Sequence, residues 1–344
     1  MKTPIKQIIA VLFLTIFSAG LCAAQSSSGY HLIKKFEVGG EGSWDYLYAD
    51  STAHRLYISR STRVIVLDSE TGASIGEIPN TNGVHGIAIA EEAGRGFTSN
   101  GRDNAVTMFD LKTLKVLGTL STGKNPDAII YDPASKRVFT FNGGSSNSTA
   151  IDAADGKVAG TIELGGRPEF ATSDGKGMVF VNLEDKSQVV AFDSRKLEVK
   201  NRWSIAPGEE PSGMAIDAKH HRLFIVCSNK KMIVLNNENG SIVAQPTIGD
   251  GPDAAGFDPE TKLAFSSNGD GTLTIVREDS DSKFTVVENV PTQLRAKTMA
   301  LDSKTHKVYL GAAQYGPTPA PTTQNPRPRA QMIPNSFVIL VYGK

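Results

Sequence analysis

The sequence predicts an all-β fold built from seven similar units. Each unit has an apolar run ending at an anchor residue, usually Asp, and a basic residue two to five positions later opens a second apolar run. The anchors lie 40 to 44 residues apart, at Asp50, Ala90, Asp132, Asp174, Asp217, Asp258 and Asp302. A period of about forty residues with short alternating runs is typical of four-stranded propeller blades. We therefore predict a seven-bladed β-propeller with antiparallel blades.

The first 24 residues are expected to be a cleaved signal peptide. Lys2 and Lys6 precede an apolar stretch at residues 8–17, which is too short to span a bilayer, and Ala24 follows small residues suited to cleavage. The protein is then expected in the periplasm or outside the cell, with residues 25–344 forming a single propeller domain.

Within a repeat, the apolar runs predict four strands. In the second repeat these are residues 86–90, 96–99, 106–109 and 116–120, which are rich in Val, Ile, Phe and Thr and bounded by turn residues. Asp at the ends of the first and third strands can cap tight turns through its carboxylate. Gly72, Gly156 and Gly240 are expected to take positive φ in the following turns.

The last repeat contains only three strand-like runs after Asp302. Residues 32–38 read like the outer strand of every other repeat, so we expect the N-terminal segment to complete the last blade and leave no open edge. Between the second and third runs lies a Pro-rich loop, residues 314–335, with Arg327 and Arg329 near its middle. This loop is either a mobile flap held electrostatically over the channel mouth or a solvated loop that contacts nothing.

Charge and cysteine content limit the possible roles. The chain has 36 basic and 36 acidic residues, and its short basic clusters are scattered over different repeats. Nucleic-acid binding needs a continuous positive surface, so it is disfavoured. Beyond the leader, no apolar run is long enough for a membrane helix, and Cys227 would be the one cysteine of the mature chain. We expect a monomer without an internal disulfide.

Several phrases resemble the repeat of YVTN/YncE-like β-propeller proteins. They are Arg63-Val-Ile-Val-Leu-Asp-Ser-Glu-Thr-Gly72, Phe97-Thr-Ser-Asn100, Phe139-Thr-Phe-Asn142 and Phe265-Ser-Ser-Asn268. The resemblance covers nearly the whole mature chain and implies an exported seven-bladed propeller, often without an assigned enzymatic activity. Related propellers include lactone-hydrolysing enzymes and quinoprotein or haem-bearing domains, so the fold alone does not choose a function.

The candidate site follows from antiparallel geometry. Loops before the innermost strand and after the second strand lie on one face, and residues five positions before each anchor should ring the channel mouth. These are Asp45, His85, Asp127, Glu169, Ser212, Asp253 and Lys297. The second class of loop adds Asn100, Asn142, Asn182, Asn229 and Asn268, slightly farther out.

These residues allow two interpretations. They are either ordinary turn residues or a binding site for a cationic ligand or a hard cation such as Ca²⁺, held by Asp45, Asp127, Glu169 and Asp253. The first functional hypothesis is an exported binding protein without catalysis, for a small molecule or a periplasmic protein. The alternative is a metal-assisted hydrolase, for example of lactones, with His85 or a carboxylate as general base.

Overall fold

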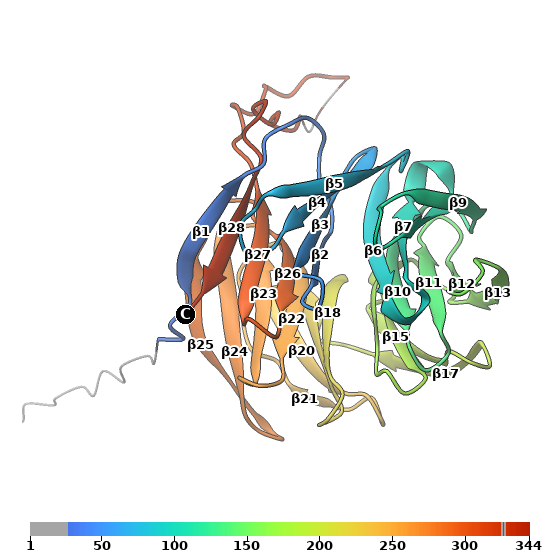
Figure 1. Ribbon diagram of the computed structural model, residues 1–344. Coiled ribbons are helices and arrows are strands. Elements are labelled where there is room, and N and C mark those ends of the chain that lie inside the picture. The colour runs from blue at the N-terminus through green and yellow to red at the C-terminus, as the bar shows by residue number, and fades with distance from the viewer. Residues whose placement is uncertain (1–26, 325, 327) are drawn as a thin grey trace, which may run out of the picture.

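The computed structural model describes residues 27–324, 326 and 328–344, so the predicted signal peptide and Arg327 lie outside the described residues. Within these residues the chain forms seven four-stranded antiparallel sheets, which are the blades of a propeller (Figure 1). The innermost strands β2, β6, β10, β14, β18, β22 and β26 each contact the next, and β26 contacts β2. The predicted seven-bladed fold is therefore confirmed.

The blades are numbered along the chain, and strands are given from the channel outward. Blade 1 is β2 (Leu47–Asp50), β3 (Arg55–Arg60), β4 (Arg63–Asp68) and β5 (Ser74–Pro79); blade 2 is β6 (Val84–Ala90), β7 (Arg95–Asn100), β8 (Ala105–Asp110) and β9 (Val116–Ser121). Blade 3 is β10 (Pro126–Asp132), β11 (Arg137–Asn142), β12 (Asn147–Asp152) and β13 (Val158–Glu163); blade 4 is β14 (Pro168–Ser173), β15 (Met178–Leu183), β16 (Gln188–Asp193) and β17 (Glu198–Ser204). Blade 5 is β18 (Pro211–Asp217), β19 (Arg222–Cys227), β20 (Lys231–Asn236) and β21 (Ile242–Ala244); blade 6 is β22 (Pro252–Asp258), β23 (Leu263–Asn268), β24 (Thr272–Ser280) and β25 (Lys283–Pro291). Blade 7 is β26 (Thr298–Asp302), β27 (Lys307–Ala312), β28 (Val338–Gly343) and β1 (His31–Glu37). The described residues also contain three short 3-10 helices, at Glu91–Ala93, Gly101–Asp103 and Glu184–Lys186.

The hydrophobic core lies between the blades rather than inside any one of them. Each cluster of buried side chains is shared by two neighbours; for example, Tyr57 of blade 1 packs with Phe109 of blade 2, and Phe139 of blade 3 packs with Phe192 of blade 4. A lone blade would leave both faces of its sheet exposed. The stability of each blade therefore depends on its two neighbours.

Turn residues behave as the sequence predicts. Asp50 at the end of β2 accepts the backbone N–H groups of Thr52 and Ala53 at 3.0 and 2.9 Å, and Asp68 at the end of β4 accepts that of Thr71 at 2.7 Å. Gly72 has a φ of +74°, and a Cβ there would come within 2.4 Å of the Phe36 ring. These positions are structural.

The ring is closed by the N-terminal strand. β1 pairs with β28, with His31 opposite Gly343 and Glu37 opposite Val338. Behind this junction Arg60 is fully buried, lies 4.2 Å from the centre of the Phe337 ring and donates to the carbonyl of Gly39 at 3.1 Å. Its Nη2 atom donates to the carbonyls of Gly40 and Glu41, which follow in the same linker, at 3.2 and 2.8 Å. One side chain of blade 1 therefore holds the segment that joins β1 to β2.

The Pro-rich loop begins as a narrow stem. Tyr315 forms a bridge with Met332, and the Gly316 N–H donates to the Gln331 carbonyl at 2.9 Å. Figure 1 shows the loop rising from the ring above β28. Arg329 is exposed, and none of the described residues 316–335 lines the central cavity. The flap remains a prediction.

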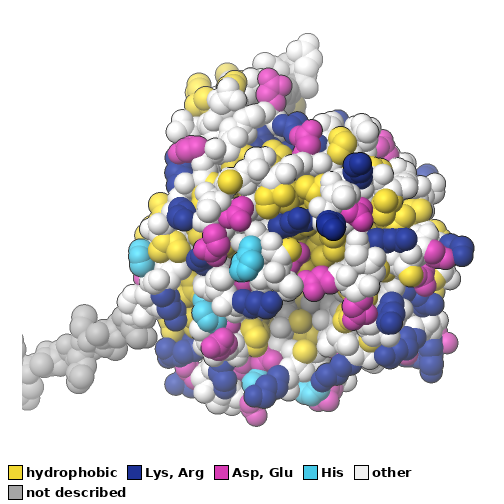
Figure 2. Space-filling view, viewed as in Figure 1, with side chains coloured by type: hydrophobic (Ala, Val, Ile, Leu, Met, Phe, Trp, Pro, Cys, Tyr) yellow, Lys and Arg dark blue, Asp and Glu magenta, His cyan; other side chains and the backbone are white. Residues whose placement is uncertain are grey.

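The surface carries mixed charge. Figure 2 shows Lys and Arg side chains interspersed with Asp and Glu over the visible face, without a continuous basic stripe. In the described part of the chain, no helix is both long and apolar enough to cross a membrane.

Candidate functional site at the channel mouth

The predicted ring residues meet at one end of the channel. A cavity of about 180 Å³ lies between the starts of the innermost strands. Six of the seven ring positions line it, namely Asp45, His85, Asp127, Glu169, Ser212 and Asp253. Lys297 lies beside it and lines an adjoining groove with Trp44, Arg295 and Tyr315. The structure thus brings these side chains together, as their spacing in the sequence predicts, and whether they bind a ligand remains a prediction.

One side of the cavity holds a histidine between two carboxylates. The Nδ1 atom of His85 lies 2.5 Å from Oδ2 of Asp45 and 3.5 Å from Oδ1 of Asp127. Burial alone would lower the pKa of His85, but the hydrogen bond with Asp45 and the charges of Asp127 and Asp45 raise it overall. This side of the cavity therefore favours the imidazolium form.

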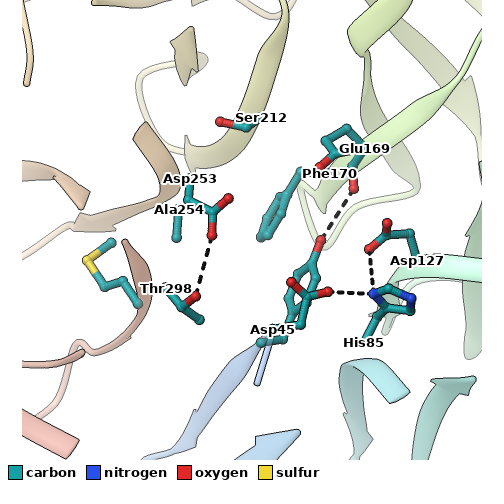
Figure 3. Close-up of a pocket in the computed structure, with 11 residues that line it drawn as sticks. Asp45, His85, Asp127, Glu169, Phe170, Ser212, Asp253, Ala254 and Thr298 are labelled. Atoms are coloured by element: carbon teal, nitrogen blue, oxygen red, sulfur yellow. Dashed lines mark hydrogen bonds and ion pairs between the residues drawn. The ribbon is translucent and has the colours of Figure 1, made fainter. Parts of the chain in front are cut away.

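The other side holds an ion pair. Nζ of Lys297 lies 2.7 Å from Oδ1 of Asp253, and the Thr298 hydroxyl donates to Oδ2 at 3.4 Å. Figure 3 shows Asp253 and Thr298 across the cavity from Asp45, His85 and Asp127. Burial raises the pKa of Asp253 although Lys297 opposes the shift. Lys297 thus neutralises a ring carboxylate from outside the cavity.

The negative charges of Asp127 and Glu169 are only partly balanced by nearby positive charge. Burial raises the pKa of Asp127 to about 6, although the charge of His85 opposes the shift. Burial, followed by the charges of Asp127 and Glu184, raises the pKa of Glu169 to about 8. Near neutral pH Glu169 therefore retains its proton, and a bound cation would favour release of that proton.

Two aromatic rings also line the cavity, which the spacing of the ring positions does not predict. Tyr46 and Phe170 stack across the channel with ring centroids 5.7 Å apart and an interplanar angle of 13°. They directly follow ring residues Asp45 and Glu169. At this next position the other five blades have Gly86, Ala128, Gly213, Ala254 and Thr298. Aromatic residues at two of seven equivalent positions, where the other blades have small residues, are the feature of the sequence that could have indicated this aromatic pair.

Polar side chains on the second strand fix the ring residues of the next blade. Ser99 donates to the carbonyl of Asp127, Ser267 donates to that of Lys297, and the Asn182 amide donates to that of Ser212 at 2.7 Å. The Ser212 hydroxyl in turn donates to the Pro252 carbonyl at 3.0 Å. The ring backbone is thereby held from blade to blade, and the mouth is preorganised.

Unlike that of Asn182, the side chains of the other four predicted asparagines form no hydrogen bond with a ring residue in the described structure, and a ligand-binding role for the five remains a prediction. Asn100, Asn142 and Asn268 are buried within their blades. Each accepts a hydrogen bond from a hydroxyl two residues earlier (Thr98, Thr140, Ser266) and donates to a third-strand threonine (Thr107, Thr149, Thr274) at 2.8 to 3.1 Å. Asn229 donates to the Pro207 carbonyl at 2.7 Å, and none of the five asparagines lines the cavity among the described residues.

The arrangement also limits the type of metal that the mouth could hold. Among the described residues, the group of ligand atoms that lies within 4.8 Å at this site consists of Asp45, His85 and Asp127. Glu169 and Asp253, which were predicted with Asp45 and Asp127 as cation ligands, are not in this group. Ca²⁺ prefers six to eight oxygen ligands, whereas an imidazole suits a transition metal. The geometry therefore does not favour the predicted Ca²⁺ site.

Comparisons with known proteins give a structural likeness. No protein-family model matches the chain, and no curated protein matches it. Among solved structures, the hydrazine synthase of Kuenenia stuttgartiensis is similar, with a TM-score of 0.68 and 16% sequence identity over 84% of this chain and 94% of that chain. At this identity the likeness shows the fold alone, and it agrees with a seven-bladed β-propeller.

Proposed function

We propose that this protein is an exported binding protein whose channel mouth takes a small organic cation, such as a primary or quaternary ammonium group. The observation that carries the proposal is the stacked pair Tyr46 and Phe170 lying beneath a ring of carboxylates. Aromatic faces and carboxylates together are the usual recognition elements for ammonium groups. A cavity of about 180 Å³ limits the ligand to a small group or to the cationic end of a larger molecule.

The carboxylates explain why a cation would be attracted. Asp127 and Glu169 both have raised pKa values, which means that negative charge is unfavourable there without a counter-charge. A ligand cation supplies that counter-charge. The affinity of the protein for the cation should therefore increase with pH as Glu169 loses its proton. This increase should continue up to about pH 8, the pKa of Glu169.

Calorimetry tests the proposal directly. Tetramethylammonium, methylammonium and CaCl₂ are titrated separately into the protein at pH 6 and pH 8.5. We expect an ammonium ion to bind more tightly at pH 8.5, and Asp127→Asn to weaken binding at least about tenfold, or about 1.4 kcal/mol. Asp155→Asn, which removes an exposed carboxylate of blade 3, is the matched control. Binding of Ca²⁺ without binding of either ammonium ion would reject the organic-cation assignment.

Export is part of the proposal and has its own test. It is supported by Lys2, Lys6 and the short apolar stretch that follows, and by the resemblance of the repeats to YVTN/YncE-like proteins. We expect the protein in the periplasmic or secreted fraction with Gln25 as its first residue. A cytoplasmic protein that retains its leader would contradict it.

A second candidate function is metal-assisted hydrolysis, and it is favoured by the group formed by Asp45, His85 and Asp127. A histidine held by two carboxylates could bind a transition metal or act as a general base toward a lactone. Lactone hydrolysis that requires an added divalent metal and is lost in His85→Asn would favour this alternative. Hydrolysis at the uncatalysed rate with Zn²⁺, Mn²⁺ and Ca²⁺ would remove it.

A further inference from the structure

A second group of titratable side chains lies far from the mouth, on the face that carries the turns between first and second strands. Asp217 ends β18, His220 lies in the following turn, and Glu278 lies near the end of β24 in the next blade. Their ligand atoms lie within 4.8 Å of one another. The group therefore spans the junction between blades 5 and 6.

One oxygen of each carboxylate lies near the histidine ring. Oδ1 of Asp217 accepts the backbone N–H groups of Lys219 at 2.9 Å and His220 at 3.3 Å. Oδ2 of Asp217 lies 2.5 Å from Nδ1 of His220, and Oε2 of Glu278 lies 3.8 Å from the same nitrogen. Two carboxylate oxygens and one imidazole nitrogen thus converge.

Glu278 is the unusual member of the group. The residue is 4% exposed, and its Oε2 atom has no hydrogen-bond partner in the described structure. A buried carboxylate is expensive unless it is paired, protonated or bound to a metal. The unpaired oxygen near Asp217 and His220 therefore requires either a proton or a bound cation.

Comparison with an equivalent blade junction shows what is different here. The Glu278 N–H donates to the Lys262 carbonyl just as the Ser194 N–H donates to the Gly177 carbonyl, so the two residues occupy equivalent positions. The Ser194 hydroxyl donates to Asp132 of the preceding blade at 2.7 Å. At the junction of blades 5 and 6, a second carboxylate replaces this donor, and two acids face each other.

We propose that Asp217, His220 and Glu278 bind a transition-metal dication of the Zn²⁺ class, independently of the channel mouth. One imidazole nitrogen and two carboxylate oxygens form a ligand set that Zn²⁺ accepts, and two negative charges match a dication. The His220 side chain is 26% exposed, whereas those of Asp217 and Glu278 are 3% exposed. The metal therefore has a route from solvent along His220, and solvent can supply a fourth ligand.

The competing arrangement is a proton shared within the group. Besides His220, the positive charge of Lys262 also acts on Glu278. The Arg222 guanidinium instead donates to the backbone carbonyls of His220 and Asp281. A shared proton would satisfy the two acids without any metal. It would make stability depend on pH and leave it unaffected by Zn²⁺.

Metal titration separates these arrangements. The purified protein is treated with a chelator and dialysed, then titrated with ZnCl₂ by calorimetry and with CoCl₂ by visible absorbance. We expect the wild type to bind one metal ion. Glu278→Gln and His220→Asn should each weaken the affinity for the metal at least about 100-fold, since even changes to outer-shell residues weaken metal binding about 10- to 100-fold. Zn²⁺ should raise the melting temperature of the wild type but not of Glu278→Gln.

Two control variants locate the metal. His306→Asn removes the comparable pair of His306 and Asp258, whose atoms lie 2.7 Å apart, at the next junction and should leave the affinity unchanged. His85→Asn should also leave it unchanged. Zn²⁺ affinity that persists in Glu278→Gln, or that is lost only in His85→Asn, would overturn the proposal. So would a melting temperature that responds to pH but not to Zn²⁺.

Discussion

Glu169 should make the protein less stable as pH rises, because its carboxyl group is easier to protonate in the folded state than in the unfolded chain. Its pKa is raised from 4.5 to about 8. Below pH 4.5 the group is protonated in both states, and its contribution to stability is fully present. Between pH 4.5 and 8 the folded state holds the extra proton, so the free energy of unfolding falls with rising pH. At 1.36 kcal/mol per pKa unit the full loss is about 5 kcal/mol.

Glu169 is only half-buried, and solvent screens its charge, so we expect a measured loss of about 2 kcal/mol. Glu169→Gln cannot titrate and should remove this component, matching the wild type near pH 5 and exceeding its stability by about 2 kcal/mol near pH 9. Urea unfolding, monitored by the fluorescence of Trp44 and Trp203, measures the free energy of unfolding of the wild type and of Glu169→Gln at each pH. Glu163→Gln, which changes an exposed carboxylate on β13, is the control. Parallel pH curves for wild type and Glu169→Gln would refute the reasoning.

Three further outcomes are expected. Deleting residues 30–38 removes β1 and exposes the edge of β28, so the melting temperature should fall or the protein should aggregate, and an unchanged melting curve would reject closure by β1. Arg60→Met removes a fully buried side chain that donates to the carbonyls of the β1–β2 linker, and it should cost about 3 kcal/mol in urea unfolding, whereas Arg63→Met at a surface ion pair should cost less than about 1 kcal/mol; equal losses would contradict this role of Arg60. Burial raises the pKa of the Cys227 thiol to about 12, so it should react with a thiol reagent only after unfolding, and rapid labelling of the native protein would contradict its burial.

The repeat period could predict the fold because each blade must present the same alternation of apolar strands and polar turns. Anchor aspartates such as Asp50 cap equivalent turns in most blades, so their spacing reports the blade length. The ring at the mouth followed from the same count, since residues at equal offsets from equivalent turns occupy equivalent places. Geometry that repeats could therefore be read from the sequence.

Side-chain direction and departures from the repeat could not be inferred in the same way. Ser99 and Asn100 are neighbours on one strand, but successive side chains point to opposite sides, so Ser99 reaches the next blade and Asn100 bonds within its own. An offset of one residue decides between the two roles. The count of residues also does not tell whether a ring residue lines the cavity, as Asp253 does, or pairs with a neighbour from outside it, as Lys297 does.

The pairing of β1 with β28 joins segments near the two limits of the described chain, and this has a kinetic consequence. During synthesis β1 emerges early but can find its partner only after the rest of the ring has been made. Because each core cluster is shared between neighbours, blade 1 also lacks one of its two clusters until blade 7 has been made. Closing so long a loop adds modestly to the equilibrium cost but slows folding, since distant contacts must form before the chain is stabilised. A nascent chain of this design therefore cannot complete its seventh blade until β28 is available to pair with β1.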